Sequence, residues 1–396
     1  MNLKISLHRY FCKYSLILIF PIILLWSVSF GNFLFENEAG SDKVENTNTY
    51  WIYVGAESAD LIHRIKFNPE LGATVEQTTA VGEIYNKTEG PHGLAIDPGG
   101  EYLYMTTGHG NPDGKFWKYK LGSMELVIEP ISLGKFPATL DVTPDGEYAF
   151  IVNFNLHGDM VPSSVSVVFL PDFVEVAQTD VGVMPHGSRI SPDGRFQYTG
   201  LMMDDQLVEI NTRNFHISRR FNVKVESEEP LPVDYQASIS RSHSVIEDHD
   251  ENKCSPTWSQ PSEDGKNIYV ACNQNDEILE ISKVDWELSR KFKTGRGPYN
   301  LDISSDNQIL AVTLKQGDGI EFIDIESGQT VARRSSSTTI THGVVISPDD
   351  RYAFVSVEGV GAEPGKVDIY ELEGFERVAS VETGQQASGI DFWKIE

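Results

Sequence analysis

The sequence predicts an all-β protein, a seven-bladed β-propeller closed by pairing of its N- and C-terminal strands in one blade. Two observations predict this fold. A hairpin-like segment recurs seven times along most of the chain, and no long stretch shows the period of an amphipathic helix. Glycine is also frequent, with 33 residues among 396, which is typical of many short strands joined by tight turns.

The repeat is clearest at residues 184–199, MPHGSRISPDGRFQYT. A Pro-x-Gly entry leads into an alternating run, a Ser-Pro-Asp-Gly turn follows, and a second run is rich in aromatic and β-branched residues, which together indicate a β-hairpin. The spacings between successive copies are 46, 48, 71, 42, 43 and 46 residues, the period of propeller blades. The equivalent anchor residues are His92, Ala138, His186, Thr257, Tyr299, His342 and Ser388.

The two ends of the repeat region complement each other. Three strands are expected at 50–54, 60–65 and 72–81, before the first complete hairpin. An inner strand is expected at 387–393, with only three residues after it. Both ends therefore belong to one blade, and this closure removes the exposed sheet edges of an open array.

The first 49 residues have a different design. Residues 1–31 combine a basic lead, an apolar run at 16–28 and small residues, which indicates a signal peptide cleaved after Ser29 or Gly31. An uncleaved membrane anchor is the alternative, because the apolar run approaches the length of a membrane helix. Residues 32–49 read as a flexible acidic linker, and 50–396 as the propeller. We therefore expect an exported protein, periplasmic or extracellular, with membrane attachment only through an uncleaved N-terminal anchor.

The charge of the chain excludes some partners. Asp and Glu number 58 against 32 Lys and Arg, a formal net charge of −26. Binding to nucleic acid or anionic lipid requires basic residues that neutralise phosphate, so neither is an expected partner.

Two cysteines remain once Cys12 is assigned to the export segment. Cys254 and Cys272 stand symmetrically about the turn at 263–264, so they should face each other across a hairpin and form a disulfide in an oxidising compartment. The alternative is a pair of buried free thiols. Metal binding by these two alone is disfavoured, because no other Cys or His lies at zinc-ligand spacing.

The 71-residue spacing contains an inserted acidic loop at 225–253. His243 and His249 lie there among acidic residues that include Glu247. Long loops on rigid scaffolds often carry function. An unconstrained surface loop explains the same composition, and the sequence does not choose between them.

The repeats resemble the YVTN-type (YncE-like) β-propeller family, which is related to cytochrome d1-like, quinoprotein-like and lactonase-like propellers. The resemblance rests on the Pro-x-Gly and Ser-Pro-Asp-Gly pattern, with Asn153 or Asn273 closing the second strand, and it covers residues 50–396. The literal Tyr-Val-Thr-Asn string is absent, and its nearest versions lie at 150–153 and 269–273. The resemblance implies a propeller but no particular activity, because such propellers differ widely in function.

The histidines are the main candidates for a site. His92, His186 and His342 hold the same repeat position at the start of an innermost strand, so they should face one another around one mouth of the channel. His109 and His157 follow second strands and should lie on the same face. We predict that these five bind a ligand or a metal. The nearby methionines would suit copper or another transition metal; they are Met160, Met184, Met202 and Met203. The alternative is a polar, water-filled mouth.

Signals for catalysis are weaker. The chain contains no Gly-x-Ser-x-Gly elbow and no His-Glu-x-x-His motif, and no catalytic residue is assigned. A lactonase-like hydrolase would need a base such as His92 or His186, assisted by Asp159 or Glu247. The sequence therefore predicts a non-catalytic binding or scaffold protein, whose partner is a protein, glycan or small ligand of the cell envelope. The alternatives are a metal-binding or redox-associated propeller, with a metal as cofactor, and a lactonase-like hydrolase.

Overall fold

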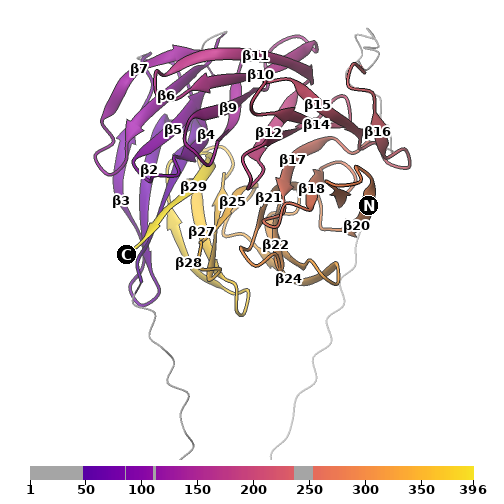
Figure 1. Cartoon of the computed structure of the whole chain (residues 1–396). Coiled ribbons are helices and arrows are strands. Elements are labelled where there is room, and N and C mark those ends of the chain that lie inside the picture. Colours follow the sequence, from indigo (N-terminus) through magenta and orange to yellow (C-terminus); the bar gives the residue numbers. More distant parts are fainter. Residues whose placement is uncertain (1–47, 85, 110–112, 236–252) are drawn as a thin grey trace, which may run out of the picture. The chain divides into compact units, whose positions relative to one another are not determined.

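The computed structural model describes residues 48–84, 86–109, 113–235 and 253–396. Seven antiparallel sheets surround a central channel, six with four strands and one with five (Figure 1). One short 3₁₀ helix, η1 (Glu57–Ala59), is the only helix within these ranges. The predicted seven-bladed all-β propeller is confirmed.

We number the blades from the first complete repeat. From the inside outward, blades 1 to 3 contain β4 (Pro91–Ile96), β5 (Tyr102–Thr107), β6 (Lys115–Lys120) and β7 (Leu126–Ser132); β8 (Pro137–Val142), β9 (Tyr148–Asn153), β10 (Pro162–Phe169) and β11 (Val174–Val183); and β12 (Pro185–Ile190), β13 (Phe196–Leu201), β14 (Gln206–Asn211), β15 (Ile217–Asn222) and β16 (Glu229–Leu231).

The remaining blades follow the same order. Blades 4 to 7 contain β17 (Pro256–Pro261), β18 (Asn267–Cys272), β19 (Glu277–Ser282) and β20 (Leu288–Lys293); β21 (Pro298–Ile303), β22 (Ile309–Leu314), β23 (Gly319–Asp324) and β24 (Gln329–Ser335); β25 (Thr341–Ile346), β26 (Tyr352–Val357), β27 (Lys366–Glu371) and β28 (Arg377–Glu382); and β29 (Ala387–Ile395), β1 (Tyr50–Ala56), β2 (Leu61–Asn68) and β3 (Gly72–Ala80).

Blade 7 joins the two ends of the propeller. β1 pairs with β2 on one side and with β29 on the other, so that Tyr53 lies opposite both Arg64 and Asp391. Outside the strands, Thr49 and Glu396 exchange two backbone hydrogen bonds of 2.7 and 2.8 Å. The innermost strand β29 also contacts both β25 and β4, which completes the ring. The predicted closure is confirmed.

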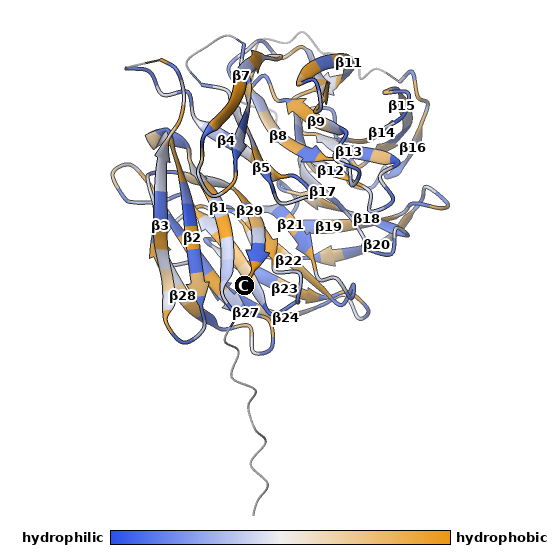
Figure 2. Ribbon diagram, turned by 60° about the vertical axis from the view of Figure 1, so that its left-hand side comes forward, coloured by the Kyte–Doolittle hydropathy of each residue, from blue (hydrophilic) through white to orange (hydrophobic). Residues whose placement is uncertain are grey.

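Hydrophobic cores lie between neighbouring blades. Hydrophobic and hydrophilic residues alternate along many strands, as expected for sheets that pack face to face (Figure 2). Tyr50 and Phe67 of blade 7 pack against Tyr352 of blade 6, with ring centroids 4.9 and 5.0 Å apart. These buried aromatic contacts connect adjacent blades around the ring.

The Ser-Pro-Asp-Gly turns are held by their own side chains. Asp193 accepts hydrogen bonds from the Ser191 hydroxyl at 2.5 Å and from the Arg195 amide at 3.1 Å. Gly194 takes a left-handed conformation with φ of 68°, which glycine adopts without steric cost. The repeated turn motif therefore sets the connection between the first and second strands.

Cys254 and Cys272 form a disulfide with a Cα–Cα distance of 4.4 Å. The register differs from the expected one, because Pro256 rather than Cys254 lies opposite Cys272. A bulge follows this pair, and Cys254 reaches Cys272 from just before β17. The pairing was predicted correctly, but the exact symmetry about the turn was wrong.

Other predicted segments lie partly or wholly outside the described residues. The N-terminal segment 1–31 is one, and so are His243, Glu247 and His249 of the insert. The described start of the insert adds β16 to blade 3 by pairing with β15. No helix among the described residues is long and apolar enough to span a membrane.

Candidate ligand site at the channel mouth

Two rings of residues meet at one mouth of the channel. The first ring is the second residue of each innermost strand in blades 1 to 6 and of β29 in blade 7. From blade 1 to blade 7 its members are His92, Ala138, His186, Thr257, Tyr299, His342 and Ser388. The second ring is the residue that directly follows the second strand of a blade. Its members, in the same order, are Gly108, Phe154, Met202, Asn273, Lys315, Glu358 and Glu57.

These rings enclose a cavity of about 440 Å³. Its wall is apolar on one side, where Phe136, Phe154 and Met202 lie, and polar on the other. His92, His109, His186 and His342 all line it. The structure thus brings together four of the five predicted site histidines. His157 contacts His109 instead of lining the cavity, with its Nε2 3.0 Å from His109 Nδ1.

The mouth is narrow enough for imidazoles of different blades to touch. The His92 ring centroid lies 5.6 Å from that of His342 and 6.2 Å from that of His186. All three side chains are buried. Because the blades place them on different sides of the channel, these short separations show how tightly the innermost strands converge.

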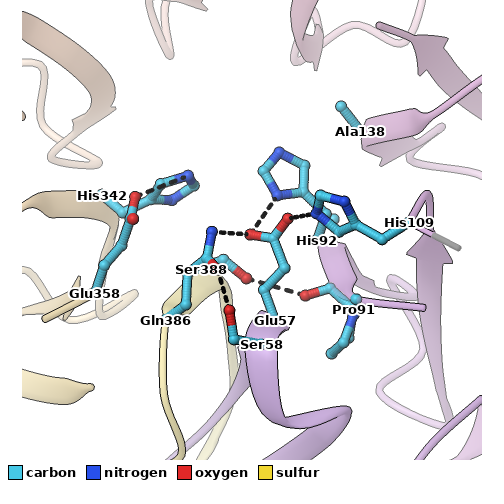
Figure 3. A network of polar contacts seen from close by, with 12 residues as sticks. Glu57, Ser58, Pro91, His92, His109, Ala138, His342, Glu358, Gln386 and Ser388 are labelled. Atoms are coloured by element: carbon cyan, nitrogen blue, oxygen red, sulfur yellow. Dashed lines mark hydrogen bonds and ion pairs between the residues drawn. The ribbon is translucent and has the colours of Figure 1, made fainter. Parts of the chain in front are cut away.

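Glu57 is the centre of the polar wall, and the sequence interpretation missed it. Its Oε2 lies 3.2 Å from His92 Nδ1 and accepts a 2.9 Å hydrogen bond from Gln386 Nε2, while Oε1 is bonded to His109 Nε2 (Figure 3). Burial would raise the pKa of Glu57, but the opposite charge on His92 and the hydrogen bonds of both histidines outweigh it and lower this pKa far below its usual value. Glu57 is therefore an ionised carboxylate.

Local backbone geometry brings His109 to Glu57. A Cβ on Gly90, which has φ of 68°, would lie 2.4 Å from His109 Cδ2, so the absence of a side chain at Gly90 makes room for this ring. The Oδ1 atom of Asp60 accepts the backbone N–H of Glu89 and of Gly90, at 3.0 and 2.8 Å. The loop before β4 is thus fixed against the end of η1.

His186 is a neutral imidazole with both nitrogens engaged. Its Nδ1 donates to the Thr257 carbonyl at 2.8 Å, and its Nε2 accepts from the Tyr299 hydroxyl at 3.1 Å. Burial lowers the pKa of His186 to about 3 and raises the pKa of Tyr299, so both groups are uncharged at neutral pH.

His342 is also buried, but its ring nitrogens are not both hydrogen-bonded as those of His186 are. Burial lowers the pKa of His342 well below its usual value. Within the part of the chain that the structure describes, its Nδ1 has no hydrogen-bond partner, and its Nε2 lies 3.9 Å from Glu358 Oε1. This Nδ1 nitrogen is an exception among buried polar atoms, most of which have a hydrogen-bond partner.

Lys315 supplies the positive charge of the cavity. Its Nζ pairs with Glu358 Oε1 at 2.9 Å and lies 4.2 Å from the centre of the Tyr299 ring. Burial would lower the pKa of Lys315, but Tyr299 and Glu358 raise it more, so the side chain is protonated. The wall therefore presents an ammonium group, two carboxylates and imidazole nitrogens to the same space.

The arrangement bears on the other sequence hypotheses. Among the described residues, no group of three or more His, Cys, Asp or Glu side chains is placed to hold a metal ion. Binding of copper or another transition metal thus stays a prediction of the sequence. Asp159, suggested as partner of a catalytic base, is exposed and absent from the cavity wall, and the carboxylate beside His92 is that of Glu57.

Fold and site together define a seven-bladed β-propeller with a histidine-lined cavity at one channel mouth. No family model matches the chain, and no curated protein does. Several solved structures are similar in fold. The periplasmic gluconolactonase PpgL of Pseudomonas aeruginosa has a TM-score of 0.65 at 19% identity, covering 87% of this chain and 99% of its own. A Bacteroides uniformis protein provisionally identified as a 6-phosphogluconolactonase has a TM-score of 0.63 at 14% identity, with the same coverage.

A third match is partial. Hydrazine synthase of Kuenenia stuttgartiensis has a TM-score of 0.49 at 24% identity over 63% of this chain, which spans 66% of that chain's length. At their identities, the first two similarities establish the propeller fold and not a shared activity.

Proposed function

We propose that this protein is an exported, non-catalytic binding propeller that holds a compact small molecule in the cavity at the channel mouth. One observation carries the proposal: buried polar groups from different blades converge on one cavity of about 440 Å³, and one of them, His342 Nδ1, has no hydrogen-bond partner among the described residues. This volume lies within the usual range of small-molecule sites. The disulfide between Cys254 and Cys272 supports export, because such bonds persist in oxidising compartments.

The wall indicates the kind of ligand. Phe136 and Phe154 offer ring faces and edges to an apolar part of the molecule. On the other side, His92, His342 and Lys315 offer hydrogen-bonding positions for oxygen-bearing groups. A molecule with a short carbon skeleton and several oxygens matches both sides.

A thermal-shift screen tests this function. The compounds are sugars, sugar acids, hydroxy acids and amino acids, and Leu156→Trp narrows the cavity because Leu156 lines it. Leu126→Trp is the matched control, since Leu126 is similarly exposed but lies on the outermost strand of blade 1. A ligand should raise the melting temperature of the wild type and of Leu126→Trp, and not of Leu156→Trp. Equal stabilisation of both variants, or no stabilising compound in these classes, would contradict the proposal.

Lactone hydrolysis is the second candidate, because one nitrogen of His92 is available to act as a base. Glu57 binds Nδ1, and no described residue forms a hydrogen bond with Nε2. Two structural neighbours are also described as lactonases. Release of acid from gluconolactone by the wild type, abolished in His92→Gln, would favour hydrolysis. Binding without turnover would favour the binding protein.

A further inference from the structure

Large apolar side chains are exposed at the channel mouth on the side of blades 2 and 3. We call them the apolar rim; they are Leu156, Met160, Val161 and Met203, and each is 38–46% exposed. The first three belong to the loop after the second strand of blade 2, and Met203 belongs to the corresponding loop of blade 3. Apolar groups that gather on a surface often mark a binding site.

The apolar rim continues the apolar wall of the cavity. Leu156 belongs to both, because it lines the cavity and is also exposed. Met184 and Met202 pack against the buried cluster that contains Phe136 and Phe154. These two methionines are adjacent, since the Met202 amide donates to the Met184 carbonyl at 3.0 Å. The partly exposed methionines thus connect the buried phenyl rings to the surface.

The backbone brings the rest of the rim to the same place. Met203 directly follows Met202, and its amide donates to the Val183 carbonyl at 3.5 Å. Val183 in turn pairs with Pro162, the residue after Val161. Blades 2 and 3 therefore form one apolar path that leads from the cavity to solvent.

The fold does not require an apolar residue in these loops. In blades 3, 4 and 5 the loop has four residues and ends in an aspartate, which is Asp205, Asp276 or Asp318. The Oδ1 atom of each accepts, at 2.7 Å, the amide of the residue directly before the next innermost strand. The second loop residue is Met203 in blade 3 but Gln274 and Gln316 in blades 4 and 5. Because the aspartate fixes the loop in all three blades, the exposed methionine needs an explanation other than folding.

We propose that the ligand of the cavity is a soluble amphiphile, whose oxygen-bearing head lies in the cavity and whose short alkyl chain leaves across the apolar rim. The proposal deepens the proposed function and rests on it for the binding of the head. An alkyl chain needs no hydrogen-bond partner, and flexible methionine side chains adapt to its shape. The polar wall opposite the rim leaves blades 2 and 3 as the exit for such a chain.

The size of the rim favours a chain over a protein partner. Its four side chains are far fewer than the roughly 20 to 30 residues that each protein contributes to a stable interface. A chain attached to a bound head also reaches the rim without a separate association step, so a small apolar contact is enough to raise affinity.

Two series of probes test the proposal, each with a constant head and a growing chain. They are n-alkyl β-D-glucosides from methyl to hexyl and n-alkyl carboxylates from acetate to hexanoate, all below the concentrations at which they form micelles. We expect the dissociation constant of at least one series to fall about two- to fourfold for each added methylene, because each methylene leaves water for the rim. Isothermal titration calorimetry measures this dependence.

Substitutions on the surface assign the dependence to the rim. Met203→Ser and Val161→Ser should flatten it and leave the affinity for the shortest member unchanged. Val360→Ser is the matched control, because Val360 is 54% exposed in the corresponding loop of blade 6. This variant should keep the wild-type dependence. All three side chains are exposed, so the melting temperatures should stay close to that of the wild type.

The methionines supply a direct readout, since the chain has only seven. In spectra of protein labelled with carbon-13 at the methionine methyl groups, hexyl members should shift the signals of Met160 and Met203. The shortest members should shift that of Met202 alone, because Met202 lines the cavity. Met105 and Met124 are buried between blades 7 and 1 and serve as internal controls.

The outcomes separate the rim from the cavity. Binding of the shortest members reports on the cavity alone, so its absence counts against the proposed function. Affinity that does not depend on chain length, or equal dependence in Met203→Ser and the wild type, would overturn the role of the rim. Shifts of Met105 and Met124 that match those of the rim, or a response that begins only when micelles form, would overturn it as well. Shifts of Met160 and Met203 on concentrating the protein without a probe would assign the rim to a second copy of this chain instead.

Discussion

The carboxylate of Asp391 accepts the backbone N–H of Ile96 at 2.7 Å, which joins the last strand of the chain to the innermost strand of the first complete blade. Asp141 and Asp302 repeat this contact, accepting the amides of Ile190 and Ile346 at 2.7 and 2.6 Å. Each carboxylate thus bridges two neighbouring innermost strands. At Asp391 the bridge crosses the junction where the ring closes.

Ring closure by β29 predicts a strong effect of truncation. Removing residues 387–396 exposes the edge of β1 and the core around Tyr50 and removes the contacts of β29 with β4 and β25. The melting temperature should therefore fall by well over 10 °C, or the protein should aggregate. Removing residues 36–48 is the control and should leave the melting temperature nearly unchanged. Equal melting temperatures for the two truncations would contradict closure as a main source of stability.

The bridging aspartates predict a pH dependence. Burial raises the pKa of Asp391 to about 7 and that of Asp302 to about 6, although each accepts two backbone hydrogen bonds. In the folded state these groups hold protons that the unfolded chain loses near pH 4. Their contribution to the free energy of unfolding therefore decreases as pH rises from about 4 to about 7.

Asp391→Asn tests this dependence because an amide does not titrate. Relative to the wild type, the variant should gain stability over this pH range, on the order of 1 kcal/mol after allowance for solvent in the channel. Thermal melts at pH 4, 5.5 and 7 measure the difference. Parallel profiles for the two proteins would show that Asp391 does not titrate there.

The disulfide predicts a moderate stability loss on its removal. Both sulfurs are buried, and the bond closes a loop between residues 18 apart in sequence. Cys254→Ser with Cys272→Ser should lower the free energy of unfolding by about 3 kcal/mol, measured by urea titration. Thiol titration of unreduced, denatured Cys12→Ser protein should find no free thiol. Two free thiols would show that the bond does not form.

The close approach of innermost strands predicts intolerance at Gly389. A Cβ on this residue would lie 2.3 Å from the His92 carbonyl oxygen and 3.0 Å from the Leu94 amide nitrogen. Gly389→Ala should therefore destabilise the protein by about 1–3 kcal/mol. Gly99→Ala is the control, since its new Cβ would meet only the side chain of Asp97. Similar melting temperatures for both variants would argue that the strands separate easily.

Much of the site was accessible from the sequence because the propeller repeats its geometry. Aligning the repeats placed His92, His186 and His342 at equivalent positions, and the closed ring turns equivalent positions into neighbours. The same logic applied to the residue after each second strand would have found Lys315 and Glu358. The sequence analysis named only His109 and His157 in the loops after second strands. The other members of the second ring, Lys315 and Glu358 among them, were missed.

Glu57 shows where sequence reasoning ended. It is one of 58 acidic residues, and its blade is completed by β29 from the other end of the chain. Gln386, which directly precedes β29 and donates a hydrogen bond to Glu57, is 329 residues away from it in sequence. No local pattern marks it as the partner of His92 and His109. The repeats by themselves determined the number of blades, the closure and the cysteine pairing, because strand alternation and turn motifs are local. Only the tertiary structure decided which carboxylate is buried among the histidines, because burial and pairing depend on how blades far apart in the chain converge on the channel.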